Sequence, residues 1–527
     1  MLTCINISII MQALAVIFLI TLPWLNPFAP GPSPSVMPWL LAVGATAGLL
    51  VLAALRRLRG LPADGQAEAQ RWAGALAWAL VLAASVSSGM ALLQYFGAAH
   101  GLSPWVSQAQ AGEAFANLRQ RNQFASLCNL GLLAVLCWAA QATGLRKERG
   151  VTLRLMLVTG VLALGNASST SRTGLLQLGL IVTMAWWWHR QSPRTTTPLI
   201  RPLLLTAVFS YLLAALVLPV MVGQALGGGI FARLQDGGPA CSSRMVLWSN
   251  VLQLIAQKPG LGWGWGELRY AHFMTLYEGP RFCEIMGNAH NLPLHLAVTL
   301  GLPAALLLCG GGTWLVWRAK PWQETDATRQ MAWGVLAVIG LHSLLEYPLW
   351  YGPFQMAVGL CLLLLWVPRT QVKPILEAMT GQKNMKNRLV SQSIRALAAI
   401  ILLAPVGYAA WDYHRISQIY LPVAQRSAAY KDNTLEKIRS SWLFQNQVQF
   451  AELTTTPLTL DNAVQINALA HGLLHYSPEA RVVEKLIGSA RLLGREDEAQ
   501  FFAVRYRAAY PKGLQNCPTC PHVSPAR

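Results

Sequence analysis

Three arginines and one histidine stand out by their positions: two of the arginines and the histidine lie at the ends of long apolar runs, and the third arginine lies in a long loop between two such runs. They are Arg121 in LRQRNQF, Arg172 in SSTSRTGLL, Arg244 in CSSRMVLW and His290 in GNAHNLPLHL. A guanidinium offers a planar fork of donors that matches phosphate oxygens, and its charge does not titrate away. A neutral imidazole can accept the proton of an attacking hydroxyl. These residue types fit a site that binds a lipid-carried diphosphate and activates a hydroxyl group.

Each of these residues also has a simpler interpretation. A single arginine at a membrane edge usually contacts lipid phosphate, and His290 alone could cap or pack a helix. His295 falls on a different face of the same expected helix and is expected to be structural. His342 and Glu346 are four residues apart, so they share a helical face and either support the site or satisfy each other.

The sequence contains no recognisable metal or nucleotide motif. It has no H-E-x-x-H, no paired Cys-x-x-Cys and no acidic cluster at metal-ligand spacing. The single CPTC, with Cys517 and Cys520, is interpreted as a tail disulfide or an inert thiol pair rather than a zinc site. A Gly-rich phosphate loop is also missing, so we expect no metal, no cofactor and no nucleotide-driven pump.

The composition separates a membrane domain from a soluble one. Of the 527 residues, 54% are hydrophobic and 12% are charged, whereas soluble domains carry roughly 25% charged residues. Apolar runs long enough to cross a bilayer recur from Ile5 to Trp411, and the charged fraction doubles from Asp412 onward. We therefore predict an all-α protein: a polytopic membrane helical bundle over residues 1–411 and a helical soluble domain over 412–527.

The apolar runs predict eleven membrane spans. Their approximate bounds are 5–25, 36–55, 72–96, 123–142, 151–166, 173–188, 202–222, 291–317, 330–346, 352–367 and 394–411. The first run has no basic segment before it and no clear cleavage site, so we interpret it as a retained span rather than a signal peptide.

The orientation of the spans follows from the lysines and arginines of the short loops, which gather on the cytoplasmic side. One alternating set of short loops holds nineteen of them, and the opposite set holds only Arg119, Arg121 and Arg172. This asymmetry places the N-terminus in the cytoplasm and the soluble domain in the periplasm, as in a multi-pass protein of a bacterial inner membrane.

The same orientation puts a long loop, residues 223–290, in the periplasm. Its centre, KPGLGWGWGELRY, is a poor span and suits the membrane interface, where tryptophan is enriched. Cys241 and Cys283 share this oxidising compartment, so a disulfide is permitted but not established. The net charge of +19 lies in short loops rather than along one stripe, so we expect no nucleic-acid partner.

The soluble tail has the pattern of paired helices. Two segments end in similar phrases, HYSPEA around Tyr476 and AAYPKG around Tyr510, and the two tyrosines are 34 residues apart. A period of 34 residues is typical of tetratricopeptide repeats. The tail is therefore predicted to be TPR-like, and a small helical bundle without repeat grooves remains the alternative.

The residues of the candidate site carry a resemblance to a known family. The segment AHNLPLHLAVTLGLPAALLL resembles the central signature of the Wzy/WaaL superfamily of O-antigen polymerases and ligases. Three further segments, SRTGLLQLGL, RQRNQFASL and HSLLEYPLWYGPF, resemble the PglL-type protein O-oligosaccharyltransferases of that superfamily. The periplasmic helical tail also resembles the C-terminal domain of the PglL-type enzymes.

The resemblance implies a glycosyltransferase. A glycan carried on undecaprenyl pyrophosphate would be transferred en bloc to a serine or threonine hydroxyl of a pilin or another periplasmic protein. The implied roles are His290 as the catalytic histidine, Arg121 and Arg172 as donor-binding arginines, Arg244 as a weaker match because its loop diverges, and Tyr347, Glu346, His342 and Asn291 as supporting residues. No metal is implied.

Other functions remain open at this point. Within the superfamily, an O-antigen ligase would use lipid A-core as the acceptor, and a Wzy-type polymerase would use another glycan. A transporter or flippase would be a different class. Its usual signs are matching halves and an ionisable path near mid-membrane, whereas the spans here contain few acidic residues and the two halves show no correspondence.

Overall fold

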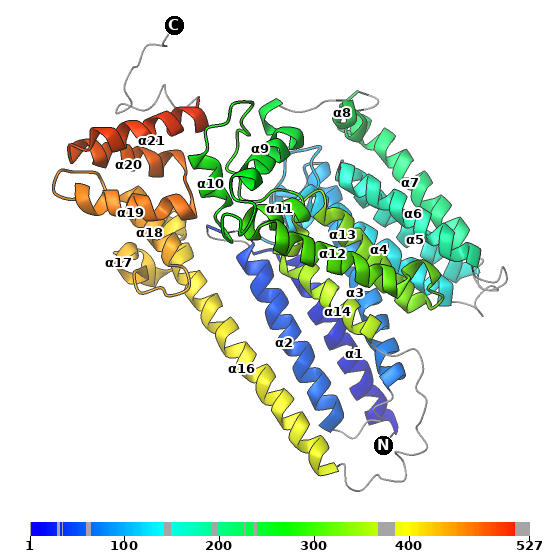
Figure 1. Ribbon diagram of the computed structural model, residues 1–527. Helices are drawn as coiled ribbons and strands as arrows, with labels where there is room; N and C mark the ends of the chain where they lie inside the picture. The colour runs from blue at the N-terminus through cyan, green and yellow to red at the C-terminus, as the bar shows by residue number, and fades with distance from the viewer. Residues whose placement is uncertain are drawn as a thin grey trace. The chain divides into compact units, whose positions relative to one another are not determined.

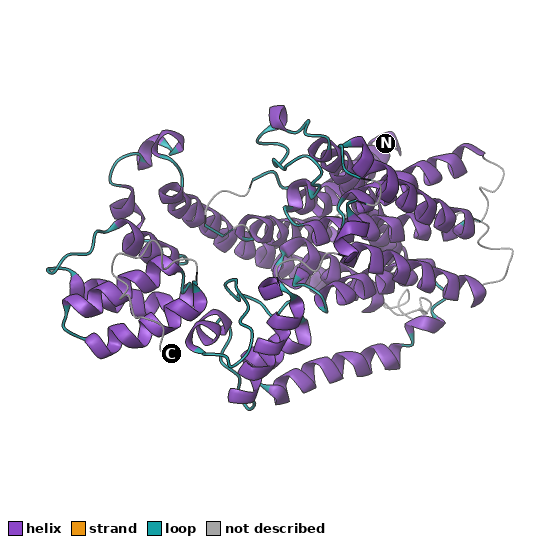
Figure 2. Ribbon diagram, turned by 90° about the horizontal axis from the view of Figure 1, so that it is seen from above, coloured by secondary structure: helices purple, strands orange, loops and turns teal. Residues whose placement is uncertain are grey.

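The computed structural model describes residues 2–28, 32–33, 35–58, 65–141, 149–191, 199–225, 228–235, 240–366 and 385–511. Over these residues the regular secondary structure consists of α-helices and short 3₁₀ turns, with no strand (Figure 1 and Figure 2). The prediction of an all-α protein is confirmed for this part of the chain.

The chain divides into two compact units. The bundle unit comprises Met1–Asp236 and Trp317–Ala410, and the loop-tail unit comprises Gly237–Val316 and Trp411–Arg527. Composition alone separates only the tail, near residue 411. The structure groups the long loop with that tail, because the two share a packed core.

Helices account for most of both units. The bundle unit contains α1 (Leu2–Leu25), α2 (Val36–Leu58), α3 (Gly65–Tyr95), α4 (Arg121–Gln141), α5 (Arg149–Ser168), α6 (Arg172–Gln191), α7 (Ile200–Met221), α8 (Ile230–Gln235), α13 (Ala327–Ser343) and α14 (Gly352–Trp366). The loop-tail unit contains α9 (Arg244–Gln257), α10 (Leu268–Met274), α11 (Leu292–Leu300), α17 (Thr434–Ile438), α18 (Gln445–Thr455), α19 (Ala463–Tyr476), α20 (Ala480–Leu492) and α21 (Glu496–Ala509). The chain passes between the units within α12 (Leu302–Ala319) and α16 (Met385–Ser417).

Helix α4 forms the centre of the bundle unit. Every residue from Gln123 to Cys137 is buried, and α4 packs against α3, α5, α6 and α13. A helix that is apolar on all sides is stable only when it is enclosed by other helices or by lipid. Ser126 and Asn129 of α4 are buried as well, and both donate hydrogen bonds to α6. Helix α4 therefore holds the adjoining helices in register.

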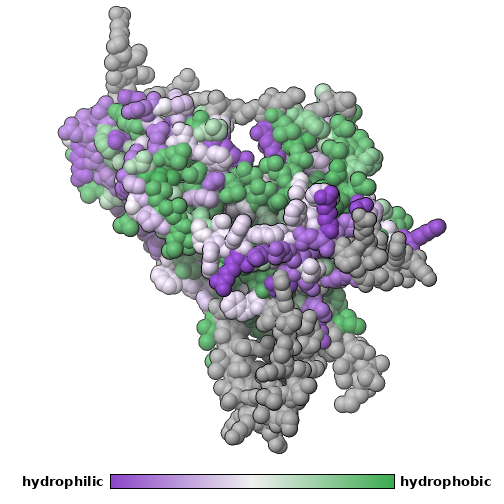
Figure 3. All heavy atoms as spheres, turned by 45° about the vertical axis from the view of Figure 1, so that its right-hand side comes forward, coloured by the Kyte–Doolittle hydropathy of each residue, from purple (hydrophilic) through white to green (hydrophobic). Residues whose placement is uncertain are grey.

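The bundle unit has the apolar helices of a multi-pass membrane protein. Helices α2, α3, α4, α5 and α7 each contain a stretch long and apolar enough to cross a bilayer, and α1 and α14 contain shorter apolar stretches. Hydrophobic side chains, green in Figure 3, cover wide areas of the surface shown there. The count of eleven spans stays a prediction, because only five helices of the described residues are long and apolar enough to cross a membrane.

The predicted span at 291–317 is wrong as a single helix. The structure divides it into α11 and α12 at Gly301, whose φ is +89°. The Gly/Trp-rich segment of the long loop lies across this break: Leu302 N–H donates to Pro259 O (2.8 Å), and Trp263 N–H donates to Val298 O (2.8 Å). A Cβ at residue 301 would lie 2.0 Å from Gly260 O, so glycine is required for this close approach.

The four long helices of the tail stack one after another. Helix α18 packs on α19, α19 on α20, and α20 on α21. Tyr476 ends α19 and Tyr510 follows α21 directly, so the 34-residue period corresponds to two successive helix pairs. The tetratricopeptide-like arrangement of these pairs stays a prediction, with a small helical bundle as the alternative.

Candidate active site

Asn122 connects three helix ends in the bundle unit. Its Nδ2 donates to Glu346 Oε1 (3.1 Å), and its Oδ1 accepts a hydrogen bond from Ser171 Oγ (2.6 Å). Asn122 belongs to the first turn of α4, Ser171 precedes α6, and Glu346 follows α13. One amide therefore holds the starts of α4 and α6 beside the end of α13.

Arg172 is the first residue of α6 and follows a tight turn from α5. Ser171 caps the helix, since its Oγ accepts the Gly174 N–H (2.9 Å), and Thr170 adopts a left-handed φ of 51°. Gly174 allows close packing, because a Cβ there would lie 2.3 Å from Asn166 Oδ1. The Arg172 side chain is exposed at the end of this turn.

Arg121 is the first residue of α4. It forms an ion pair with Glu113, and its side chain remains 31% exposed. The turn before it is closed by Gln120, whose Oε1 accepts the Gln123 N–H (2.6 Å). Free N–H groups and the helix dipole make a helix N-terminus favourable for anions. Asn122 joins the start of α4 to the start of α6, so this cluster contains two helix N-termini and two guanidinium groups.

A buried polar network lies beneath these residues. His342 Nδ1 and Ser126 Oγ are 2.9 Å apart, and Gln177 Nε2 donates to Ser126 Oγ (2.8 Å). The expectation that His342 and Glu346 share a helical face needs correction, because α13 ends at Ser343 and Glu346 lies beyond it. Both nevertheless bond to α4, His342 through Ser126 and Glu346 through Asn122.

Two further residues border this cluster. Tyr347, next to Glu346, stacks on Tyr351 with ring centroids 6.1 Å apart. Arg233 of α8 donates through Nη1 to Thr170 O (3.0 Å), in the turn that precedes Arg172. Sequence reasoning missed Arg233 because it treated this region as one long loop. Arg233 is one of five basic residues in that loop, and no local sequence signal distinguishes it from the others.

In the loop-tail unit, His290 lies on a sharply bent turn just before α11. Its φ is 51°, and its N–H donates to Asn288 Oδ1 (2.9 Å). Asn291 is the N-cap of α11, with its Oδ1 accepting the Leu294 N–H (3.0 Å), and Trp248 Nε1 donates to Ala289 O (3.0 Å). The turn is thus fixed on both sides of His290, whose side chain is partly exposed.

His295 lies one turn further along α11 and is buried. Its side chain is 4% exposed, and its Nδ1 accepts the Ala289 N–H (3.4 Å). Its ring also contacts Trp265 edge-on, with centroids 5.8 Å apart. These contacts give His295 a structural role in holding the turn, as expected from its position on the helix.

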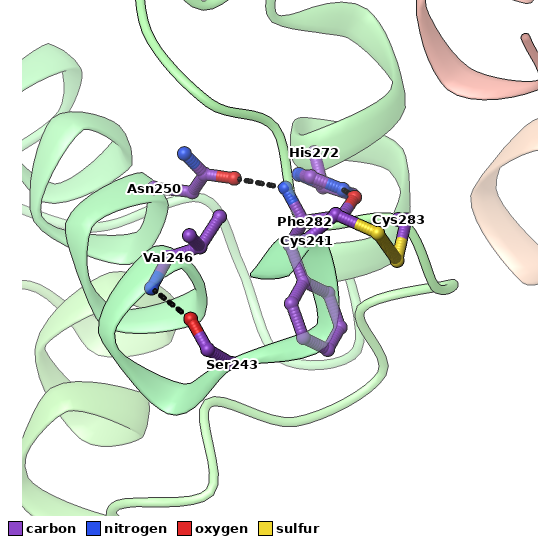
Figure 4. The surroundings of a disulfide bond; sticks show 7 residues. All are labelled: Cys241, Ser243, Val246, Asn250, His272, Phe282 and Cys283. Atoms are coloured by element: carbon purple, nitrogen blue, oxygen red, sulfur yellow. Dashed lines mark hydrogen bonds between the residues drawn. A yellow bond between two sulfur atoms is a disulfide. The ribbon is translucent and has the colours of Figure 1, made fainter. Parts of the chain in front are cut away.

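Arg244 begins α9 and lies close to a disulfide. Ser243 caps the helix by accepting the Val246 N–H (3.3 Å). Cys241 and Cys283 are bonded, with Cα atoms 5.4 Å apart (Figure 4). The pairing that the sequence only permitted is therefore present in the structure. Cys517 and Cys520 lie outside the described residues.

A buried histidine stabilises the loop beside the disulfide. One ring nitrogen of His272 lies 2.9 Å from Tyr277 Oη. The other lies 3.1 Å from Phe282 O, and the N–H of Phe282 donates to Asn250 Oδ1 (2.8 Å) (Figure 4). Burial, with a smaller contribution from the charge of Arg281, lowers the pKa of His272 to about 3. His272 is therefore neutral at physiological pH and cross-links the loop as a hydrogen-bonding group.

The structure groups the predicted site residues by unit. Arg121, Arg172, His342, Glu346 and Tyr347 gather around the starts of α4 and α6. The other predicted site residues belong to the loop-tail unit: Arg244, His290 and Asn291. Donor binding by Arg121 and Arg172, and the action of His290 together with them, stay predictions. The described residues contain no group of three or more histidine, cysteine or acidic side chains arranged to hold a metal ion.

Three stretches of the chain match known protein families. Residues 155–309 match the family described as O-antigen ligase, residues 114–138 match protein glycosylation ligase, and residues 330–518 match virulence factor membrane-bound polymerase, C-terminal. The first stretch contains Arg172 and His290, and the second contains Arg121. These matches confirm the resemblance to the Wzy/WaaL superfamily.

Two curated relatives make the resemblance more specific. A general O-oligosaccharyltransferase of Acinetobacter baylyi is 25% identical over 262 residues, which cover 49% of this chain and 44% of that protein. A ComP-specific O-oligosaccharyltransferase of the same organism is 24% identical over 291 residues, covering 54% of this chain and 49% of that protein. The chain thus spans about half the length of these relatives. No solved structure gives a significant match. The resemblance to PglL-type enzymes is confirmed.

Proposed function

We propose that this protein is a protein O-oligosaccharyltransferase of the inner membrane. It transfers a glycan en bloc from undecaprenyl pyrophosphate to a serine or threonine hydroxyl of a pilin or another periplasmic protein. The single observation that carries the proposal is the pair of helix starts at Arg121 and Arg172, joined through Asn122. The family matches over the same residues support it.

The chemistry requires an anion site and a base. The arginines at the starts of α4 and α6 hold the diphosphate and stabilise the negative charge that it gains as it leaves. His290 accepts the proton of the acceptor hydroxyl while the acceptor oxygen bonds to the first carbon of the glycan. The bond from that carbon to the diphosphate oxygen breaks, and the lipid pyrophosphate departs. Glu346 and His342 position α4 rather than react.

A second candidate is transfer to lipid A-core. The match of residues 155–309 to O-antigen ligase favours it specifically. The donor chemistry would be the same, so the acceptor separates the two functions. The tail matches a polymerase C-terminal family, which makes chain extension the third possible outcome of the same experiment.

The test is co-expression with a lipid-linked glycan and a pilin in cells that lack other ligases. The proposal predicts that the intact mass of the pilin increases by one whole glycan, and that the His290→Ala variant does not modify it. An unmodified pilin together with glycan on lipid A-core would replace the proposal with the ligase function. Longer lipid-linked glycans would indicate a polymerase, and unlinked periplasmic glycan would indicate a transporter.

A further inference from the structure

Helix α10 of the long loop belongs to two hydrophobic cores at once. Leu268 and Ala271, 1% and 0% exposed, pack into the core of the loop together with Met286 and Ala289. Phe273, 2% exposed, packs into the core of the tail instead. The side chains on one face of α10 thus hold the loop, while those on the other face hold the tail.

Polar and aromatic contacts strengthen the attachment of α10 to the tail. Glu267 Oε2 and His475 Nδ1 are 2.6 Å apart, and Tyr270 stacks on the His475 ring with centroids 4.0 Å apart. Arg505 of α21 donates through Nε to Met274 O (3.1 Å). The short helix is therefore fixed to α19 near its start and to α21 at its end.

Arg269 is the residue of α10 that contacts both the tail and the turn of His290. Its Nη1 donates to Tyr476 O at the end of α19 (3.1 Å). Its guanidinium also lies against the backbone of Gly287, where an added Cβ would be 2.9 Å from Arg269 Nε. Gly287 directly precedes Asn288, whose Oδ1 accepts the N–H of His290.

We infer that Arg269 is a positioning residue through which the tail holds the His290 turn in its active conformation. The inference rests on the proposed function only in taking His290 as the catalytic base. It gives the tail a role besides acceptor binding. A truncation after Gln418 removes the core around Phe273 and the carbonyl of Tyr476, so it impairs transfer even if the tail never touches the acceptor.

The test compares Arg269→Ala with Arg505→Ala in the full-length protein. Arg505→Ala is the matched control, because it removes a hydrogen bond between tail and α10 while leaving the Arg269 contacts with Gly287 and Tyr476 in place. Amide hydrogen exchange of the peptide 284–291 reports local opening of the turn. We expect exchange to accelerate about tenfold in Arg269→Ala and to stay at the wild-type rate in Arg505→Ala.

Arg269→Lys provides the second variant. Lysine keeps a donor for Tyr476 but loses the guanidinium group that lies beside Gly287, so exchange should accelerate at 284–291 and not in α19. Wild-type exchange in both Arg269 variants would overturn the inference. Loss of folded protein in both, with Arg505→Ala intact, would also overturn it in favour of a general stability role. Exchange needs no turnover, so failure of the proposed function would appear separately, as wild-type protein without transfer.

Discussion

At the residue scale, the positions of Arg121 and Arg172 distinguish them from ordinary interfacial cations. Each is the first residue of its helix, so each guanidinium adds to the positive end of a helix dipole. Their neighbours Asn122 and Ser171 share a hydrogen bond of 2.6 Å. The proposed function places one diphosphate at both helix ends, whereas in the lipid-contact interpretation each arginine binds a separate headgroup.

Replacement by lysine tests this distinction. Arg121→Lys and Arg172→Lys keep the charge but lose the planar fork. Losing one charge-assisted hydrogen bond costs roughly 1.5 kcal/mol, so transfer at limiting donor should fall about tenfold. Arg119→Lys is the matched control, because Arg119 donates to the backbone oxygen of Pro27, a bond that lysine can also make. Initial rates of glycan transfer measure the effect. Wild-type rates in both variants would return these arginines to the lipid-contact interpretation.

The buried His272 makes the loop sensitive to acid. Its pKa is lowered from 6.5 to about 3 in the folded protein, so below about pH 6.5 the unfolded chain binds a proton that the folded chain does not. The free energy of unfolding should be constant above that pH and fall by up to about 1.4 kcal/mol per pH unit toward pH 3. Thermal unfolding of the wild type and of His272→Gln at pH 7.5 and pH 5 measures this pH dependence of stability. Equal pH dependence in both proteins would contradict it.

Sequence reasoning could find only some residues of the site. Arg121, Arg172 and His290 stand out because they contrast with apolar surroundings and with the charge asymmetry of the loops. Asn122 carries no charge, and its importance comes from two partners distant in sequence, Ser171 just before α6 and Glu346 beyond α13. Such a contact is set by tertiary packing and has no local signal.

At the element scale, the break between α11 and α12 separates the short helix that follows His290 from the longer apolar helix after it. The segment 291–317 is continuously apolar, so hydropathy predicts one span. The break arises from tertiary contacts: the backbone of Pro259–Gly264 runs across Gly301 and bonds to both helices. Without that packing, a single glycine in an apolar run is compatible with a continuous helix, and composition could not predict the division.

Gly301→Ala tests the break. The backbone at residue 301 has φ +89° and ψ 164°, a region nearly restricted to glycine, where strain costs roughly 1–3 kcal/mol. The new Cβ would in addition lie 2.0 Å from Gly260 O. We expect a clear decrease in melting temperature for Gly301→Ala. Gly311→Ala in α12 is the control, since a Cβ there meets nothing within 4 Å, and equal melting temperatures would show that the break is dispensable.

At the scale of the whole molecule, composition predicts the helical class and the change in character near residue 411. It does not predict that the loop folds with the tail, because this depends on α10 being shared by two cores. The unit boundary therefore follows contacts rather than charge content. A domain division based on composition separates apolar from charged stretches of the chain and misses its compact units.

Reporter insertions test the orientation of the whole chain. A reporter after Lys147 should lie in the cytoplasm, and a reporter in the exposed turn at Gly494, between α20 and α21, should lie in the periplasm. The physical reason is the excess of basic residues in one set of short loops. Alkaline phosphatase and fluorescent reporters distinguish the two compartments. A cytoplasmic signal at Gly494 would reverse the orientation and remove the site from the periplasm.

The most direct test of the account is the activity of His290→Asn. Asparagine tolerates the left-handed φ of 51° at this position and keeps the turn, but it cannot accept a proton at neutral pH. General-base catalysis contributes roughly 10²- to 10⁴-fold. We expect glycosylation of the pilin per folded enzyme molecule to fall by at least about 10²-fold, while abundance and melting temperature stay near those of the wild type. Near-normal glycosylation by His290→Asn would contradict the catalytic role of this histidine.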